Sequence, residues 1–316
     1  MSAALDELGS GGAAGAGGGG AGSLRGRQAG HRPRRARRAA GIVALVVGGF
    51  LMMIPFLWML SASLKTRAEV FSTSPFEFPT GLHFDNYTRM WFAMPGVTFG
   101  TFFQNSIVIA VLATAGQLIT CSMAGYAFAV LEFRGKRVLF ALILATLIIP
   151  FQVVLVPNFV LYRYLPWPLS ESGNWIGTNL PLWVWAFFGG AFGTFLLRQF
   201  YLTIPSELAD AARVDGASPW QIYRRIYLPL GRPALATLAI FQFMWSWNDL
   251  LSPLIYLRDL PQYTTTVGLA FFQGQFVGKW PEMMAGALVS LAPMVILFIV
   301  AQRYFVRGIA LSGLKG

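Results

Sequence analysis

The sequence of 316 residues contains few side chains that could carry out catalysis or bind a metal ion. It has one cysteine, Cys121, and two histidines, His31 and His83, which excludes an intrachain disulfide and a multi-histidine zinc site. No P-loop occurs, because Gly135-Lys136 and Gly278-Lys279 are followed by Arg and Trp, and zinc-protease and nucleophile-elbow motifs are also absent. We therefore expect no catalytic residue, no metal and no cofactor, so the chain is not an enzyme.

The residues that could contact a solute are concentrated in one apolar stretch. Asp249 is the only acidic residue clearly inside such a stretch, and Trp245, Trp247 and Asn248 precede it. Aromatic rings pack on the apolar faces of sugars, while amides and carboxylates bind hydroxyl groups. With Asn105 from an earlier stretch, these residues are a candidate solute path. They could equally join neighbouring helices by packing and hydrogen bonding, and the sequence leaves both interpretations open.

The composition indicates that lipid surrounds most of the chain. Apolar residues make up 55% of it and charged residues 12%, about half of what a soluble domain carries. Six apolar stretches approach the ~20 residues that a membrane-spanning helix needs. They cover residues 41–60, 101–131, 138–162, 180–202, 234–257 and 283–305. The expected fold class is therefore all-α and polytopic, with six transmembrane helices.

Proline and glycine residues predict local features of these helices. Pro150, Pro157 and Pro293 predict bends, either as packing curvature or as hinges beside a pathway. Gly189 and Gly193 form a G-x-x-x-G pattern, which permits close helix approach. The first stretch is longer than the apolar region of a cleaved signal peptide, so we expect it to be retained.

The basic residues predict the orientation. Of the 24 Lys and Arg residues, 18 fall in the N-terminal tail, the C-terminal end, and the connections after the second and fourth stretches. The positive-inside rule then places both termini in the cytoplasm. Residues 1–38 are rich in Gly, Ala and Arg, with seven arginines between Arg25 and Arg38. We interpret them as a disordered cytoplasmic tail whose arginines lie beside lipid, rather than as a nucleic-acid-binding arm, ahead of a membrane domain at 39–316.

The connection at residues 204–229, here called the coupling segment, has a helical pattern of its own. Pro205 suits the first turn of a helix, Gly216 suits a left-handed terminator, and Ser218 with Gln221 forms a capping box that starts a second helix. Pro229 is expected to end that second helix. Two short helices meeting at a glycine corner could help the membrane helices to pack, or could form a docking surface for a partner protein.

The spacing of this segment resembles that of a known motif. Asp210-Ala211-Ala212, three residues, Gly216, nine residues, and Ile226-x-Leu228-Pro229 are similar to the EAA loop of bacterial ATP-binding-cassette (ABC) importer permeases, with Asp in place of the usual Glu. The strings Ser246-Trp247-Asn248-Asp249 and Gln302–Gly308 resemble carbohydrate-uptake permeases of the maltose and glycerol-3-phosphate type. The resemblance covers about residues 41–316.

The resemblance implies a type I ABC importer permease fold in the bacterial inner membrane. It also implies a sugar substrate and several partners: a second permease subunit, two cytoplasmic ATPases and an extracytoplasmic solute-binding protein. Glu207 and the motif residues would then contact the ATPases. An importer for glycerol-3-phosphate, amino acids or peptides would share the motif. An ion-coupled carrier is disfavoured, because such carriers usually need several buried charges.

Overall fold

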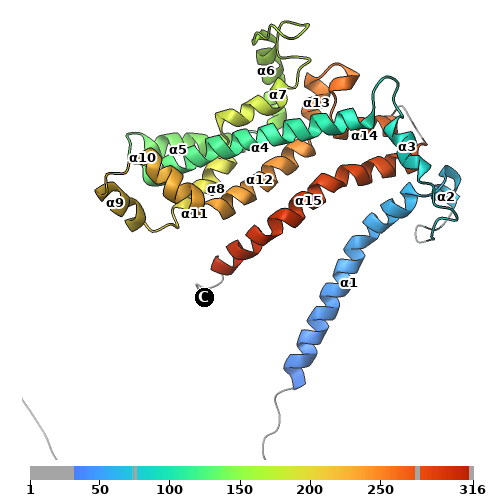
Figure 1. Cartoon of the computed structure of the whole chain (residues 1–316), viewed down its shortest axis with the longest axis horizontal. Coiled ribbons are helices and arrows are strands. Elements are labelled where there is room, and N and C mark those ends of the chain that lie inside the picture. The colour runs from blue at the N-terminus through green and yellow to red at the C-terminus, as the bar shows by residue number, and fades with distance from the viewer. Residues whose placement is uncertain (1–31, 73, 75–76, 275–277, 313–316) are drawn as a thin grey trace, which may run out of the picture. The chain divides into compact units, whose positions relative to one another are not determined.

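The structure is a computed structural model that describes residues 32–72, 74, 77–274 and 278–312 (Figure 1). Most of the predicted tail, residues 1–31, and the end of the chain, residues 313–316, therefore lie outside the described residues. The last part of the predicted tail belongs to a helix that begins at Arg32.

All regular elements in the described ranges are helices, which confirms the all-α prediction. In chain order they are α1 (Arg32–Ser63), α2 (Arg67–Ser72), α3 (Asp85–Trp91), α4 (Phe99–Val130), α5 (Lys136–Ala145), η1 (Thr146–Ile148), α6 (Phe151–Tyr164), α7 (Leu180–Trp183), η2 (Val184–Phe188), α8 (Ala191–Tyr201), α9 (Glu207–Val214), α10 (Pro219–Ile222), η3 (Tyr223–Tyr227), α11 (Leu228–Leu230), α12 (Arg232–Trp247), α13 (Leu251–Tyr256), η4 (Leu260–Gln262), α14 (Thr265–Gly274) and α15 (Trp280–Ser312).

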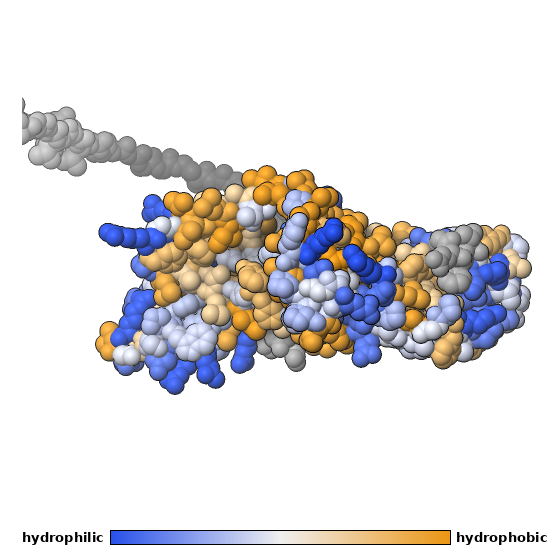
Figure 2. All heavy atoms as spheres, turned by 90° about the horizontal axis from the view of Figure 1, so that it is seen from above, coloured by the Kyte–Doolittle hydropathy of each residue, from blue (hydrophilic) through white to orange (hydrophobic). Residues whose placement is uncertain are grey.

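Four single helical runs are long and apolar enough to cross a membrane, and two bent helix pairs bring the number to six if each pair counts as one span. The single runs are Arg37–Ser63, Phe99–Val130, Leu180–Tyr201 and Trp280–Val300. Apolar side chains also cover large parts of the face seen in Figure 2. This range of four to six spans agrees with the predicted six-helix membrane architecture.

The chain divides into two compact units, residues 1–54 and residues 55–316. The described part of the first unit is the stretch of α1 that ends at Ile54. Its apolar side chains are exposed, as at Leu45 and Met52. Apolar side chains such as these need lipid or protein to cover them.

In the second unit, α4 is the central helix. It packs against α8, α12 and η2, and α12 also packs against α15 (Figure 1). A β-carbon at Gly193 would lie 2.8 Å from Cys121 Sγ, so the predicted close approach is confirmed at this glycine. Gly189 has nothing within 4 Å and instead adopts a positive φ of 90° directly after η2.

Three of the predicted spans are interrupted. Between α5 and α6 the axis turns by 101°, because Pro150 forces the preceding Ile149 into an extended conformation. Gly189 and Gly190 separate η2 from α8. The stretch predicted as one helix over 234–257 is split after Trp247, since Pro253 has no N–H for an α-helical bond to the carbonyl of Asp249. By contrast, Pro157 and Pro293 lie inside α6 and α15 without ending them.

Candidate functional site

The coupling segment contains the predicted glycine corner. α9 ends at Val214, and Gly216, directly after the C-cap residue Asp215, has a φ of +79°. The N–H of Gly216 donates to the Arg213 carbonyl at 3.0 Å, and the N–H of Ala217 donates to the Ala212 carbonyl at 2.9 Å. These are the two hydrogen bonds of a Schellman motif, which satisfies carbonyls at the helix end. The structure therefore confirms the left-handed terminator.

The second half of the coupling segment begins with the predicted capping box. Ser218 Oγ accepts from the Gln221 N–H, and Gln221 Oε1 accepts from the Ser218 N–H. The second helix runs through η3, a π-helix, and ends at Leu230, one residue after the predicted end at Pro229. A π-turn shifts the hydrogen-bond register by one residue, and it lies directly before the proline that lacks an N–H. Pro205 likewise lies before α9 rather than in its first turn.

The α9 helix has one buried and one exposed side. Ala209 is buried against the protein, and Ala212 is partly buried against the same apolar cluster. Glu207, Asp210 and Ala211 are exposed, with Val214 88% exposed. Asp210 pairs with Arg213 at 2.6 Å on the surface. The exposed side thus combines small and apolar residues with charges, as a docking surface requires.

The remaining motif residues face the protein's own core. Ile226 and Leu228 are partly buried and pack against the cluster that contains Cys121, Leu197 and Leu238, and Pro229 is half-buried. These residues therefore fix the coupling segment to α4 and α8. Among the motif residues, Asp210, Ala211 and Gly216 in the first half are exposed, whereas Ile226, Leu228 and Pro229 in the second half are partly buried.

A cavity of about 820 Å³ lies among α4, α6, α7, α8, α12 and α13. Its wall is mostly apolar and aromatic, including Tyr162, Trp185, Phe241 and Tyr256. Polar side chains interrupt this wall at six positions: Gln117, Asn158, Gln242, Ser246, Asp249 and Ser252. Among the described lining residues, Asp249 is the only charged one. Apolar walls with a few placed polar groups are typical of a binding site for a small molecule.

Two of the predicted solute-path residues line this cavity. Trp245 is 69% exposed on α12, and Asp249 lies between α12 and α13. Asp249 Oδ1 also accepts a hydrogen bond from the N–H of Ser252 at 3.1 Å. That N–H belongs to the first turn of α13 and has no partner within the helix, so the carboxylate stabilises the helix start.

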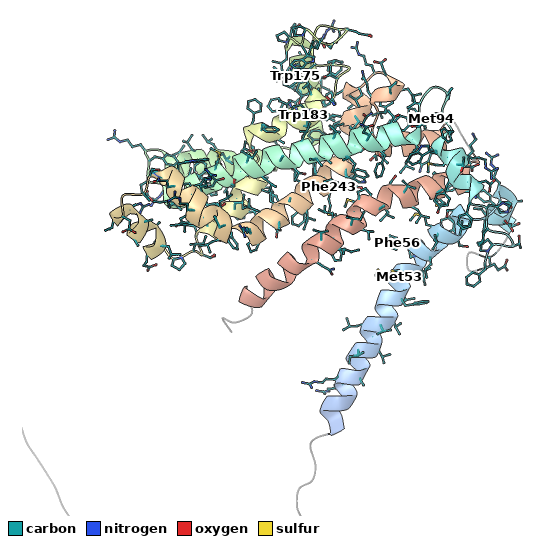
Figure 3. All side chains as sticks on the ribbon, viewed as in Figure 1. Met53, Phe56, Met94, Trp175, Trp183 and Phe243 are labelled. Atoms are coloured by element: carbon teal, nitrogen blue, oxygen red, sulfur yellow. The ribbon has the colours of Figure 1, made fainter. Side chains whose placement is uncertain are left out.

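Two further predicted residues have structural partners instead. Trp247 is buried, its Nε1 donates to the Ser290 carbonyl at 3.1 Å, and its ring stacks on Phe243, which lies on α12 (Figure 3). Asn248 Nδ2 donates to the Met244 carbonyl at 2.8 Å, at the end of the same helix. Neither residue lines the cavity. Trp247 joins α12 to α15, as the helix-joining interpretation expects, whereas the Asn248 side chain bonds within α12 and joins no other helix.

Asn105 lies in a second hollow. Its Nδ2 donates to the carbonyls of Pro261 at 2.8 Å and Tyr263 at 3.0 Å. It lines a pocket of about 710 Å³ whose other polar residues include Asn179, Arg258, Asp259 and Gln262. The side chains of Tyr162, Ile176 and Tyr256 form one apolar cluster between the two hollows, with the tyrosines on the cavity and Ile176 on the pocket.

Asn158 and Gln242 also line the cavity, although no role was predicted for them from the sequence. Each is an isolated polar residue in an apolar stretch, and that pattern could have identified them as candidate site residues. Gln117 of α4 also lines the cavity. Its amide lies against Gly190, where a β-carbon would overlap with Nε2.

The loop after α1 holds the most perturbed carboxyl group outside the spans. Glu69 accepts hydrogen bonds from the N–H and hydroxyl groups of Thr80 and of Thr66. These bonds, the Thr80 hydroxyl first, favour the ionised form and lower the pKa of Glu69 from 4.5 to about 2. The carboxylate therefore links Thr66 to Thr80 at neutral pH.

An all-helical chain with long apolar spans, interrupted helices beside a cavity and a capped helical corner is a multi-spanning membrane protein. The chain belongs to the family of binding-protein-dependent transport system inner membrane components, whose sequence profile matches residues 121–311. This family assignment confirms the predicted membrane location, and the prediction of a non-enzymatic subunit.

Relatives and solved structures agree with the assignment. The chain is 35% identical over 270 residues to the arabinooligosaccharides transport system permease protein AraQ of Halalkalibacterium halodurans, covering 84% of this chain and 92% of the relative. It is 34% identical to the osmoprotective compounds uptake permease protein GgtD of Synechocystis sp., covering 86% and 91%. It is 31% identical to the sn-glycerol-3-phosphate transport system permease protein UgpE of Salmonella typhi, covering 84% and 93%.

The fold matches that of a chain in a crystal structure of a bacterial ABC transporter that imports alginate, with a TM-score of 0.71 and 24% identity over 87% of this chain and 98% of that one. A second structure of a bacterial alginate transporter, bound to a periplasmic protein carrying an alginate pentasaccharide, matches with a TM-score of 0.60 and 15% identity over 85% and 94%. The ABC importer permease fold predicted from the resemblance is confirmed.

Proposed function

We propose that this chain is the membrane-spanning permease subunit of an ATP-driven importer of neutral saccharides. The observation that carries the proposal is the coupling segment, a capped helical corner at one end of the second unit whose α9 helix has an exposed face (Figure 1). The EAA-type spacing of this segment and relatives named for arabinooligosaccharides and for osmoprotective compounds support a role in ABC-type uptake.

ATP hydrolysis takes place in two cytoplasmic ATPases, since the sequence has no P-loop. The exposed face of α9, formed by Glu207, Asp210, Ala211 and Val214, docks on one of them. Small side chains allow close approach, and the flanking charges orient the two surfaces. Gly216 fixes the angle at which this helix is presented.

The solute follows the two hollows. A solute-binding protein delivers the saccharide at the polar pocket that contains Asn105, and the saccharide then enters the cavity lined by Trp245 and Asp249. A second permease subunit completes the cavity wall. Aromatic rings there pack on sugar faces, while Gln117, Asn158 and Gln242 bind hydroxyl groups.

A neutral solute is favoured over glycerol-3-phosphate, although one relative carries that name. The only charge on the described cavity wall is the carboxylate of Asp249. In a site of low dielectric constant this carboxylate repels a phosphate dianion, and no described arginine or lysine lines the cavity to offset that repulsion.

The proposal includes an orientation with both termini in the cytoplasm, which places the coupling segment beside the ATPases. A chain lacking residues 2–38 loses seven of the 18 basic residues assigned to the inner side. We expect partial inversion of its first span. Cysteine labelling from the outside then reaches Ala40→Cys, at the N-terminal end of that span, in a fraction of the molecules. A uniform wild-type orientation of the shortened chain contradicts the orientation argument.

The function is tested with the complete transporter in proteoliposomes that carry MgATP. We expect uptake of radiolabelled arabinotriose or maltose, and none of glycerol-3-phosphate, in the presence of the solute-binding protein. Uptake of glycerol-3-phosphate alone would favour the alternative solute class. ATP-independent uptake driven by a sodium or proton gradient would overturn the proposal.

A further inference from the structure

Two hydroxyl groups join the second half of the coupling segment to α4. The Tyr223 hydroxyl lies 2.7 Å from Ser122 Oγ, and the Tyr126 hydroxyl donates to the Pro219 carbonyl at 3.0 Å. Ser122 and Tyr126 are four residues apart on α4 and therefore lie on one face of it. Two points on one helix face thus hold α10 and the π-turn in place.

The number of hydroxyl hydrogens determines which residue donates in the bond between Tyr223 and Ser122. Ser122 Oγ also donates to the Ile119 carbonyl at 3.0 Å. A serine hydroxyl has one hydrogen, so Tyr223 must be the donor in its bond to Ser122. Both side chains are buried, with Tyr223 6% and Ser122 1% exposed. Without Ser122 as its acceptor, the Tyr223 hydroxyl would be a buried donor with no partner, which is costly.

Aromatic packing reinforces the connection. The Tyr126 ring lies 5.3 Å from that of Tyr223 and 5.2 Å from that of Tyr227, between ring centroids. Tyr227 in turn contacts Tyr201 of α8 at 5.6 Å. These four residues, here called the tyrosine cluster, are all buried. The cluster therefore packs η3 against both α4 and α8.

The same helix also lines the cavity, but with its opposite face, because Ala113 and Ser122 are nine residues, or two and a half helical turns, apart. Ala113 and Gln117 of α4 line the cavity, and Ser122 lies little more than one helical turn further along. The first half of the coupling segment has no such described side-chain hydrogen bond to α4. In α9, Arg213 donates to Asp210 of the same helix.

We propose that Tyr223 is a positioning residue for coupling: its hydrogen bond to Ser122 makes α10 and the π-turn move with α4 as one body, so that a displacement of the coupling segment reaches the cavity wall. This inference rests on the proposed function, in which the ATPases move the coupling segment. Gly216 allows α9 to seat on the ATPase, while Tyr223 transmits the displacement.

The test uses the transporter assembled with its second permease and its ATPases in lipid nanodiscs, with MgATP and vanadate as the probe. Spin labels at Gln104→Cys and Arg225→Cys, both exposed, report the distance from the far end of α4 to the π-turn. Cys121 is fully buried and stays unlabelled. We expect a narrow distance distribution that MgATP does not change, because both labels belong to one body.

Three variants separate transmission from stability: Ser122→Ala, Tyr223→Phe and the double variant. Ser122→Ala leaves the Tyr223 hydroxyl buried without an acceptor and should lower the Tm of the complex, and adding Tyr223→Phe removes that hydroxyl and should restore the Tm. The distance distribution should be at least twofold broader in all three. Solute imported per ATP hydrolysed should stay at least threefold below wild type even in the double variant. Tyr164→Phe, at an exposed tyrosine, is the control and should match wild type.

If the double variant regains a narrow distribution together with its Tm, the bond is purely structural and the inference is overturned. An unchanged distribution in Tyr223→Phe also overturns it. A wild-type complex that imports no saccharide refutes the proposed function instead, and the label distances still decide whether Tyr223 joins the segment to α4.

Discussion

Gln117 of α4 reaches so close to Gly190, in the break between η2 and α8, that a β-carbon at position 190 would overlap with the Gln117 amide nitrogen. The backbone of Gly190 is extended, with a φ of −156°, so its conformation would suit any residue. The need for glycine is therefore steric. Because both residues line the cavity, the glycine determines where the Gln117 amide lies on the cavity wall.

Gly190→Ala should change transport more than stability. The amide end of Gln117 is flexible and can turn away, so we expect a loss of less than about 1 kcal/mol in stability. The displaced amide no longer meets a solute hydroxyl, and the apparent KM for uptake should rise severalfold at a constant amount of complex. The matched control is Gly49→Ala, where nothing lies within 4 Å of the added carbon. An unchanged KM contradicts a solute role for Gln117.

Gly125→Ala should lower the stability of the complex more than it changes transport. Here the β-carbon would lie 2.9 Å from Leu197 Cβ and 3.0 Å from the backbone nitrogen of Arg198, neither of which can move without shifting α8. Overpacking of this kind costs about 1–3 kcal/mol. We expect less assembled complex in detergent, measured by size-exclusion chromatography, with a normal KM in the remainder. Full assembly would show that α4 and α8 can separate at little cost.

Gly216→Val should weaken docking on the ATPase. Nothing lies within 4 Å of the added carbon, so the effect comes from the positive φ alone, which costs a β-branched residue about 1–2 kcal/mol. We expect co-purification of the ATPases and uptake to fall together, while the amount of permease in the membrane stays constant. Gly216→Asn should be milder, since asparagine tolerates this conformation. Wild-type docking by the valine variant would exclude α9 as the docking helix.

Asp249 combines a position on the cavity with a bond to the start of α13, and two substitutions separate these roles. Asp249→Asn keeps a side-chain oxygen for the Ser252 N–H, whereas Asp249→Leu loses that bond, at about 1 kcal/mol. If Asp249 contacts the solute, the leucine variant should raise the apparent KM severalfold with ATPase activity intact, and the asparagine variant less. Reduced assembly at an unchanged KM would assign Asp249 a structural role only.

The lowered pKa of Glu69 predicts that the stability of the segment after α1, which includes α2, depends on pH. Its pKa is depressed from 4.5 to about 2, so the ionised, hydrogen-bonded form stabilises the loop fully above pH 4.5, and this stabilisation is lost as the pH falls towards 2. Hydrogen exchange at the N–H groups of Thr66 and Thr80, corrected for the intrinsic rate, should rise across that window. In Glu69→Gln the same amides should show no such transition. A transition that persists in this variant has another origin.

Local sequence rules predicted the parts of the coupling segment that depend on local bonds. The left-handed Gly216 and the box of Ser218 and Gln221 involve residues within a few positions of one another. The π-turn before Pro229 was not predicted, because helix propensity does not reveal a shift in the hydrogen-bond register. The burial of Tyr227 in the second half follows from contacts with Tyr126 and Tyr201, which belong to other helices.

The cavity was predicted only in part for the same reason. Composition and spacing identified Asp249 and Trp245 as unusual in an apolar stretch, and both line it. Trp247 has the same chemistry but points towards Ser290 on α15, a relationship that no local pattern contains. Asn158 became a lining residue through the break at Pro150, whose 101° turn is a property of two helices together.

The break at Pro150, between η1 and α6, also constrains how the chain enters the membrane during synthesis. α6 has 14 residues and rises only about 21 Å, and α5 with η1 is similarly short, so neither half alone crosses a hydrocarbon core of about 30 Å. The carbonyls freed at the turn have no partner in lipid until other protein segments surround them. The third span should therefore leave the translocon late, after α7 and α8 have been made.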